Sequence, residues 1–93
     1  MNKYKILKRV KIDLAKHSKT GNTKHFKGGD ELETPTELIL GKYPKDSHGY
    51  YLFYMDSFGN EMTDTYHESS INAIKQAEFE FGIQQDEWND VNE

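Results

Sequence analysis

Apolar and polar residues alternate along the first part of the chain. Between Tyr4 and Leu14 the even positions are apolar apart from Lys8, and the odd positions are polar apart from Leu7. A period of two is typical of a β-strand that buries one face, because successive side chains of a strand point to opposite sides. We therefore expect a strand over residues 4–14 with its even-numbered side chains against the core.

Three further segments have the composition of strands. Residues 36–43 and 50–56 are rich in aliphatic and aromatic side chains, and the second of these runs is apolar on both faces. A turn over residues 57–60 follows and leads directly into residues 61–67. Two strand-like runs joined by a short turn that contains glycine and asparagine indicate a β-hairpin.

The pattern then changes to that of a helix. Ser69 is suited to cap the first turn, and Gly82 can adopt the left-handed conformation that ends a helix. Apolar residues recur between them at spacings of three and four, which predicts that one side of the helix packs on the sheet. These residues are Ile71, Ile74, Ala77 and Phe81.

Together these elements predict the α+β class, with a four-stranded antiparallel sheet and one C-terminal helix packed on one face (β-β-β-β-α). A chain of 93 residues suits a single domain over residues 1–93, which buries roughly 60 to 65% of its unfolded surface. Residues 15–35 show no sustained apolar period, so they form a long loop that either carries function or contains a short element. With no cysteine, the chain has no disulfide and no thiolate metal site.

Charge is distributed unevenly along the sequence. Residues 1–30 contain nine basic residues and two acids, whereas residues 31–93 contain three basic residues and fourteen acids. The loop over 15–35 is therefore basic, and residues 84–93 form an acidic tail around Trp88. Either the two parts of the chain lie against each other and weaken each other's field, or one of them binds a charged partner.

The residues capable of catalysis or metal binding form no recognised set. His17 and His25 with Asp30 match no metal-binding spacing, and Asp64 and His67 point to opposite faces of their strand. The loop sequence KTGNTKHFKGGD lacks the order of a phosphate-binding loop. We therefore expect no enzymatic activity, no metal and no cofactor.

A single helix covers only one face of the predicted sheet, although residues 50–55 offer large side chains to both faces. The uncovered aromatic residues either form cross-strand pairs with Thr63 and Thr65 or form a contact patch for a second copy or another protein. The sheet is therefore one of two candidate binding surfaces, and the acidic tail is the other.

The segment YLFYMDSFGNEMTDTYHESSINAIKQAEFEFG, residues 51–82, resembles small bacterial proteins that include candidate immunity proteins of polymorphic or contact-dependent toxin systems. The turn from Asp56 to Gly59, the run Thr63-Asp64-Thr65 and the acidic helix carry the resemblance. A hairpin followed by a helix is also similar to antitoxins of the HicAB type and to the arm-binding domain of tyrosine recombinases. The recombinase similarity conflicts with the acids of the hairpin, since that family needs basic residues to face phosphates.

The resemblance and the acidic charge predict a protein-binding module that inhibits a bacterial toxin, with a basic toxin domain as the partner. We expect Glu80 to face solvent together with the tail acids, and Trp88 to act either as an apolar plug or as the anchor of the interface. The predicted partner-binding residues are Glu80, Asp86, Glu87, Trp88, Asp90, Tyr50 and Tyr54.

The alternative function is nucleic-acid binding through the basic residues between Lys8 and Lys27. The start of the chain lacks the apolar core of a signal peptide, and no run approaches the roughly 20 apolar residues that span a membrane. We therefore expect a cytoplasmic protein without membrane contact, either a monomer or a homodimer.

Overall fold

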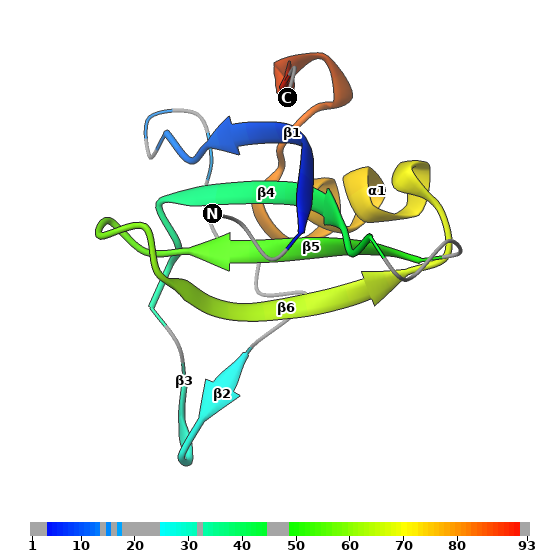
Figure 1. Ribbon diagram of the computed structural model, residues 1–93. Helices are drawn as coiled ribbons and strands as arrows, with labels where there is room; N and C mark the ends of the chain where they lie inside the picture. Colours follow the sequence, from blue (N-terminus) through cyan, green and yellow to red (C-terminus); the bar gives the residue numbers. More distant parts are fainter. Residues whose placement is uncertain are drawn as a thin grey trace.

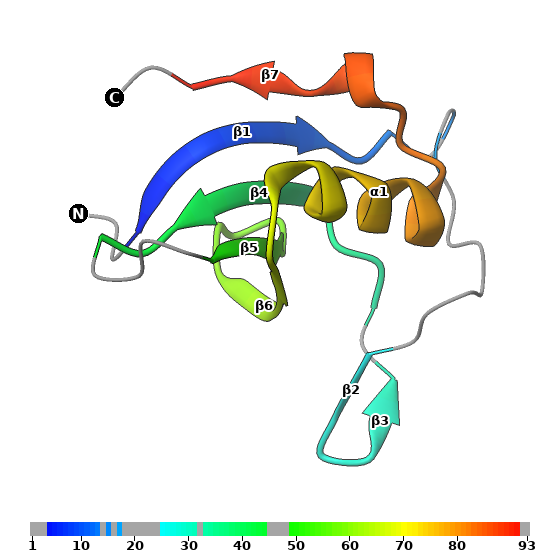
Figure 2. The ribbon, with the colours of Figure 1, turned by 90° about the vertical axis from the view of Figure 1, so that its right-hand side faces the viewer.

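The computed structural model describes residues 4–13, 15, 17, 25–31, 33–44 and 49–91 (Figure 1). Five antiparallel strands form the main sheet in the order β6-β5-β4-β1-β7, and α1 packs on one face of this sheet (Figure 2). The expected α+β class is confirmed, with four main strands and one helix. The elements are β1 Lys5–Lys11, β2 Phe26–Lys27, β3 Asp30–Glu31, β4 Glu37–Lys42, β5 Tyr50–Met55, β6 Glu61–His67, α1 Ser70–Phe81, the 3-10 helix η1 Gln85–Glu87 and β7 Asn89–Asp90.

Two regions contain elements that the sequence pattern does not reveal. Within residues 15–35, β2 and β3 pair as a short hairpin whose turn uses Gly28 and Gly29 at positive φ. In the acidic tail, η1 is followed by β7, which pairs with β1 so that Lys8 faces Asp90 and Arg9 faces Asn89. Figure 2 shows β7 lying beside β1 at one edge of the main sheet. The tail therefore extends the sheet.

A β-bulge changes the faces of β1. Ile6 pairs with Gly41 but Lys8 pairs with Leu40, so Leu7 is the extra residue. An inserted residue reverses the direction of the side chains that follow it. Ile6 therefore packs on the face opposite α1, while Val10 packs on the face beneath α1. The expectation that all even-numbered residues of this strand share one face is wrong.

Helix α1 begins and ends where the sequence predicts. The Ser69 side chain accepts a hydrogen bond from the backbone N–H of Asn72, and Gly82 adopts the left-handed conformation with φ of 73°. The buried stripe of α1 differs from the predicted one, however, and Ile71 is 58% exposed. With successive helical residues turned by roughly 100°, Ile71 lies about 120° from the centre of the buried stripe. The stripe consists of Ala73, Ile74, Ala77, Glu80 and Phe81.

The sheet separates two apolar clusters. The larger cluster lies between the sheet and α1 and includes Leu38, Leu52 and Ile83. The smaller cluster lies on the other side, which we call the open face, and consists of Ile6, Ile39, Phe53 and Met55 with partly buried Tyr4, Tyr43, Tyr51 and Val91 against them. None of the helices in the described part of the chain has the length and apolar character needed to cross a membrane.

Candidate functional site

The seven predicted partner-binding residues do not lie on one surface. Glu80, Tyr54 and Trp88 are buried, with exposed fractions of 3%, 1% and 8%. Tyr50 is half-buried on the face beneath α1, where the Lys42 ammonium group lies 4.6 Å from the centre of its ring. The remaining three residues, Asp86, Glu87 and Asp90, belong to the tail.

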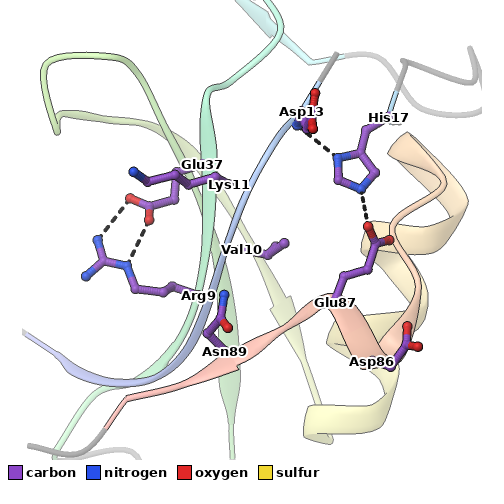
Figure 3. Close-up of a pocket in the computed structure, with 9 residues that line it drawn as sticks. All are labelled: Arg9, Val10, Lys11, Asp13, His17, Glu37, Asp86, Glu87 and Asn89. Carbon is purple, nitrogen blue, oxygen red and sulfur yellow. Dashed lines mark hydrogen bonds and ion pairs between the residues drawn. The ribbon is translucent and has the colours of Figure 1, made fainter. Parts of the chain in front are cut away.

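Two of the tail acids line a pocket of about 550 Å³ beside β1 (Figure 3). The pocket brings together residues from β1, β4, η1, β7 and the segment that follows β1. Its lining residues are Arg9, Val10, Lys11, Asp13, His17, Glu37, Asp86, Glu87 and Asn89.

Most of the charged groups of this pocket already have partners. Arg9 donates two hydrogen bonds to the Glu37 carboxylate, from Nε at 2.8 Å and from Nη2 at 3.0 Å. The fully buried His17 accepts a hydrogen bond at Nδ1 from the backbone N–H of Asp13, so its ring proton lies on Nε2 and is donated to Glu87 over 2.8 Å. Figure 3 shows this chain of contacts from Asp13 through His17 to Glu87. The arrangement fastens the segment after β1 to the tail and leaves little charge for a ligand.

A second group of polar side chains lies beneath α1 around Glu80. The Glu80 carboxylate accepts hydrogen bonds from the Tyr54 hydroxyl and from Gln76 Nε2, the latter over 2.9 Å, and lies 2.7 Å from His25 Nε2. The His25 ring also packs on the Tyr54 ring, with centroids 4.6 Å apart. Burial, and then the hydrogen bond to Glu80, raise the pKa of Tyr54 well above its usual range. The expectation that Glu80 faces solvent is therefore wrong, since Glu80 lies on the buried stripe of α1.

The Glu80 cluster contains the residue types of acid–base catalysis, but its geometry is that of a structural network. Both carboxylate oxygens of Glu80 are engaged, and its side chain is 2% exposed, so a substrate has no access to it. Nearby, Thr65 Oγ1 lies 2.7 Å from His67 Nε2. Burial lowers the pKa of His67, against the opposing charge of Glu80.

His17 and His25, which the sequence analysis considered as metal ligands, lie in different environments. His17 contacts Glu87 and His25 contacts Glu80. Among the described residues, no three or more His, Cys, Asp or Glu side chains are arranged to hold a metal ion.

The open face carries a surface that combines acids with tyrosines. The register of β5 with β6 sets Phe53 opposite Asp64, Met55 opposite Glu61 and Tyr51 opposite Tyr66, which places all three β6 side chains on the open face. We call the group of Tyr43, Tyr51, Glu61, Asp64 and Tyr66 the acidic–aromatic surface.

Ring contacts and exposed charge characterise the acidic–aromatic surface. The Tyr51 ring forms T-shaped contacts with the Tyr43 and Tyr66 rings, with centroids 4.9 Å and 5.3 Å apart. Tyr66 is 51% exposed, and Glu61 and Asp64 are also exposed. Burial, followed by the negative charges of Glu61 and Asp64, raises the pKa of Tyr43. The surface therefore presents a negative field beside large amphipathic side chains.

Tyr50 and Tyr54, which the sequence analysis assigned to partner binding, do not lie on the uncovered face of the sheet. Leu52 and Tyr54 are fully buried, and they and Tyr50 point toward α1, because the odd-numbered residues of β5 face the other way. Asp64 and Tyr66 share a face because they are two positions apart, which the sequence shows. Glu61 joins them because the β5–β6 pairing shifts register at its beginning, so that Thr63 faces Tyr54 and Glu61 faces Met55.

The basic and acidic parts of the chain lie against each other. Lys8 of β1 forms an ion pair with Asp90 of β7, and Arg9 pairs with Glu37 of β4. Of the two interpretations of the uneven charge, internal pairing is the one in agreement with these contacts. The chain matches no protein-family model, no curated protein and no solved structure, so its function is argued from this geometry.

Proposed function

We propose that the chain is a protein-binding module that recognises a basic partner through the acidic–aromatic surface and acts as an immunity-type or antitoxin-type inhibitor of a bacterial toxin. The observation that carries the proposal is the exposure of Asp64 and Glu61 beside Tyr66, on the face opposite α1. Tyrosine gives a large contact area at a low cost in conformational entropy. Acids around it accelerate encounter with a basic protein and exclude acidic ones.

The acidic tail is a weaker candidate for the same role. Asp90 is paired with Lys8 and Glu87 with His17, and Glu80 is buried in its own network. The Lys8 ammonium group weakens the field of Asp90, and Glu87 and Glu80 are already engaged in hydrogen bonds. The surface of β6 therefore supports protein binding better than the tail does.

Nucleic-acid binding through β1 is the second candidate function, and the ion pairs of β1 count against it. Lys8 and Arg9 both contact carboxylates, whereas a protein that binds phosphates leaves its basic side chains available. Residues 18–24 of the basic loop lie outside the described residues. Retention on heparin at low salt, abolished by neutralising Lys8 and Lys11, would favour this second function.

The test of the proposed function compares two variants with the same change in charge. The wild-type chain, Glu61→Gln/Asp64→Asn and Glu78→Gln/Asp86→Asn are immobilised in parallel and exposed to lysate of a bacterium that produces a basic nuclease toxin. The expected result is a basic protein that is retained by the wild-type chain and by the second variant and lost by the first. Its association rate should fall with added salt. Equal retention by both double variants would contradict the assignment of this surface.

A further inference from the structure

The main sheet has one long open edge. Among the described residues, β6 contributes seven residues and pairs only with β5, whereas the opposite edge is formed by the two residues of β7. Figure 1 shows β6 along the lower border of the main sheet, with the β2–β3 hairpin outside the ladder. Within the described segments, no backbone hydrogen bond other than those of the β5–β6 ladder reaches residues 62–67. Alternate residues of an edge strand turn their N–H and C=O groups outward, so β6 offers a template for another strand.

The protective features common on edge strands are almost absent from β6. Natural edges are blocked by proline, by charged side chains and above all lysine, by short length or by bulges. β6 contains neither proline nor lysine. Its register shift lies at the beginning of the strand, between the pairs Met55–Glu61 and Tyr54–Thr63. The only charged residues of β6 at neutral pH are Glu61 and Asp64, and both are acids.

These acids determine which strand the edge can accept. A second copy of β6 paired antiparallel about residue 64 would set Asp64 against its own counterpart, and like charges directly opposite each other are destabilising. A strand that carries lysine or arginine at the same place would be favoured instead. The charge of β6 therefore selects against self-association and in favour of a basic segment.

The spacing of β6 side chains specifies the partner further. Asp64 and Tyr66 lie two positions apart on the open face, and Thr65 lies between them on the face beneath α1. An added strand would place one side chain opposite Asp64 and the side chain two residues further along opposite Tyr66. A basic residue fits both places, through an ion pair with Asp64 and through contact of a guanidinium group with the exposed Tyr66 ring. Opposite Thr65, a β-branched residue is favoured.

We propose that β6 binds an extended segment of the partner protein by β-strand addition, and that this segment alternates basic with β-branched residues. The inference rests on the proposed function, because it specifies how a basic partner would be held at the acidic–aromatic surface. Backbone hydrogen bonds supply affinity in this mode, and alternate side chains supply specificity.

The probe is a capped synthetic peptide in which Lys or Arg alternates with Val, added to the full ¹⁵N-labelled chain. The expected result is saturable binding, with NMR shifts along residues 62–67 and slower hydrogen exchange of the outward amides of β6. Asp64→Asn should weaken binding about tenfold, the loss expected for one charge-assisted contact. Asp86→Asn, which removes the same charge from the tail, should leave binding unchanged. A peptide of the same composition with its basic residues contiguous should bind much more weakly.

Peptide N-methylation separates strand addition from attraction by charge alone. Two peptides methylated at alternate amides, one at the odd and one at the even positions, keep every side chain. Strand addition requires one of them to lose binding and the other to retain it, because only alternate amides face β6. If both bind as the parent does while Asp64→Asn still weakens binding, strand addition is overturned and the proposed basic-partner function stands. Absence of peptide binding, or a concentration-dependent dimer that Thr65→Pro abolishes, also overturns the inference.

Discussion

At the scale of single residues, the most consequential side chain is Glu80. A carboxylate beneath a helix is costly to bury unless its oxygens are hydrogen-bonded. Three donors surround Glu80, from β5, from α1 itself and from the segment before β2. The contact with His25 joins a loop residue to the core, so this network couples the folding of distant segments.

Replacing the Tyr54 hydroxyl should show how much the Glu80 network contributes. Tyr54→Phe removes one donor and leaves the buried carboxylate incompletely paired, so we expect the free energy of unfolding to fall by about 1 to 3 kcal/mol. Tyr66→Phe is the matched control, since the Tyr66 ring is half exposed, and it should change stability by less than about 0.5 kcal/mol. Urea unfolding measures both values. If Tyr54→Phe lowers the free energy of unfolding as little as Tyr66→Phe does, the buried hydrogen bond contributes little to stability.

The lowered pKa of His67 predicts a loss of stability in acid. Burial disfavours the charged ring in the folded protein, while in the unfolded chain His67 titrates near its ordinary pKa of about 6.5. The contribution is therefore complete above pH of about 6.5 and is lost as pH falls through the lower folded-state pKa. His67→Gln should reduce the slope of unfolding free energy against pH in this range. An unchanged slope, or an NMR titration of His67 above its ordinary pKa, would refute this explanation.

At the scale of elements, the buried stripe of α1 separates two isoleucines that the sequence pattern treats alike. Ile74→Ala should lower the free energy of unfolding by about 2 to 4 kcal/mol, because it removes apolar contacts and leaves a cavity. Ile71 is 58% exposed, so Ile71→Ala should change the free energy of unfolding by about 0.5 kcal/mol or less. Equal effects in urea unfolding would mean that the helix packs with another face.

Gly41 permits the close approach of β1 and β4 on the open face. A Cβ atom at this position would lie 2.9 Å from Tyr4 Cδ2 and 3.0 Å from both the Lys5 carbonyl oxygen and Phe53 Cε2. Tyr4 and Phe53 stack with centroids 3.9 Å apart, so the space above the glycine is filled by aromatic rings. The glycine is therefore required by packing on this face.

Gly41→Ala should consequently lower the free energy of unfolding by about 1 to 3 kcal/mol and reduce the near-ultraviolet circular dichroism of the stacked rings. In a Tyr4→Leu background the additional loss should be smaller, because one of the two close rings is gone. A neutral or stabilising Gly41→Ala would show that the backbone of β1 can move away without cost.

The sequence predicts most elements of this fold because their signals are local. The Ser69 cap, the Gly82 terminus and the apolar run of β4 each depend on neighbouring residues. The bulge at Leu7 and the two-residue strand β7 depend on pairing between distant segments, and no short pattern records them. The buried position of Glu80 follows from the orientation of α1 on the sheet. The spacing of apolar residues predicted a different orientation, with Ile71 buried and Glu80 exposed.

At the scale of the whole molecule, the tail is part of the core. Trp88 is buried in the larger cluster with Val10 and Ile83. Trp88→Ala should therefore lower the free energy of unfolding by about 3 to 5 kcal/mol, whereas Asp90→Asn, which removes an exposed ion pair, should cost less than about 1 kcal/mol. Thermal or urea unfolding of the two variants measures the difference. If Trp88→Ala has normal stability, Trp88 is not an apolar plug, and its role as an interface anchor is favoured instead.

The position of the candidate site was accessible from the sequence only in part. The uneven charge and the aromatic residues of β5 indicate an acidic, tyrosine-rich protein surface. β7 pairs with β1 and sets Asp90 against Lys8, whereas the exposed acids of β6 lie at the opposite edge of the sheet. Long-range topology, and not composition, therefore separates the tail from the acidic–aromatic surface.

The sheet order also has a consequence for the nascent chain. β1 is synthesised before β7, the strand that covers its outer edge in the described part of the fold, and the paired residues Lys8 and Asp90 are 82 positions apart. Throughout that interval an uncovered strand could join the edges of other nascent chains. Lysine on an edge opposes such pairing, and β1 carries Lys5, Lys8 and Lys11. Until β7 pairs with β1, these lysines therefore oppose pairing of the uncovered edge with other chains.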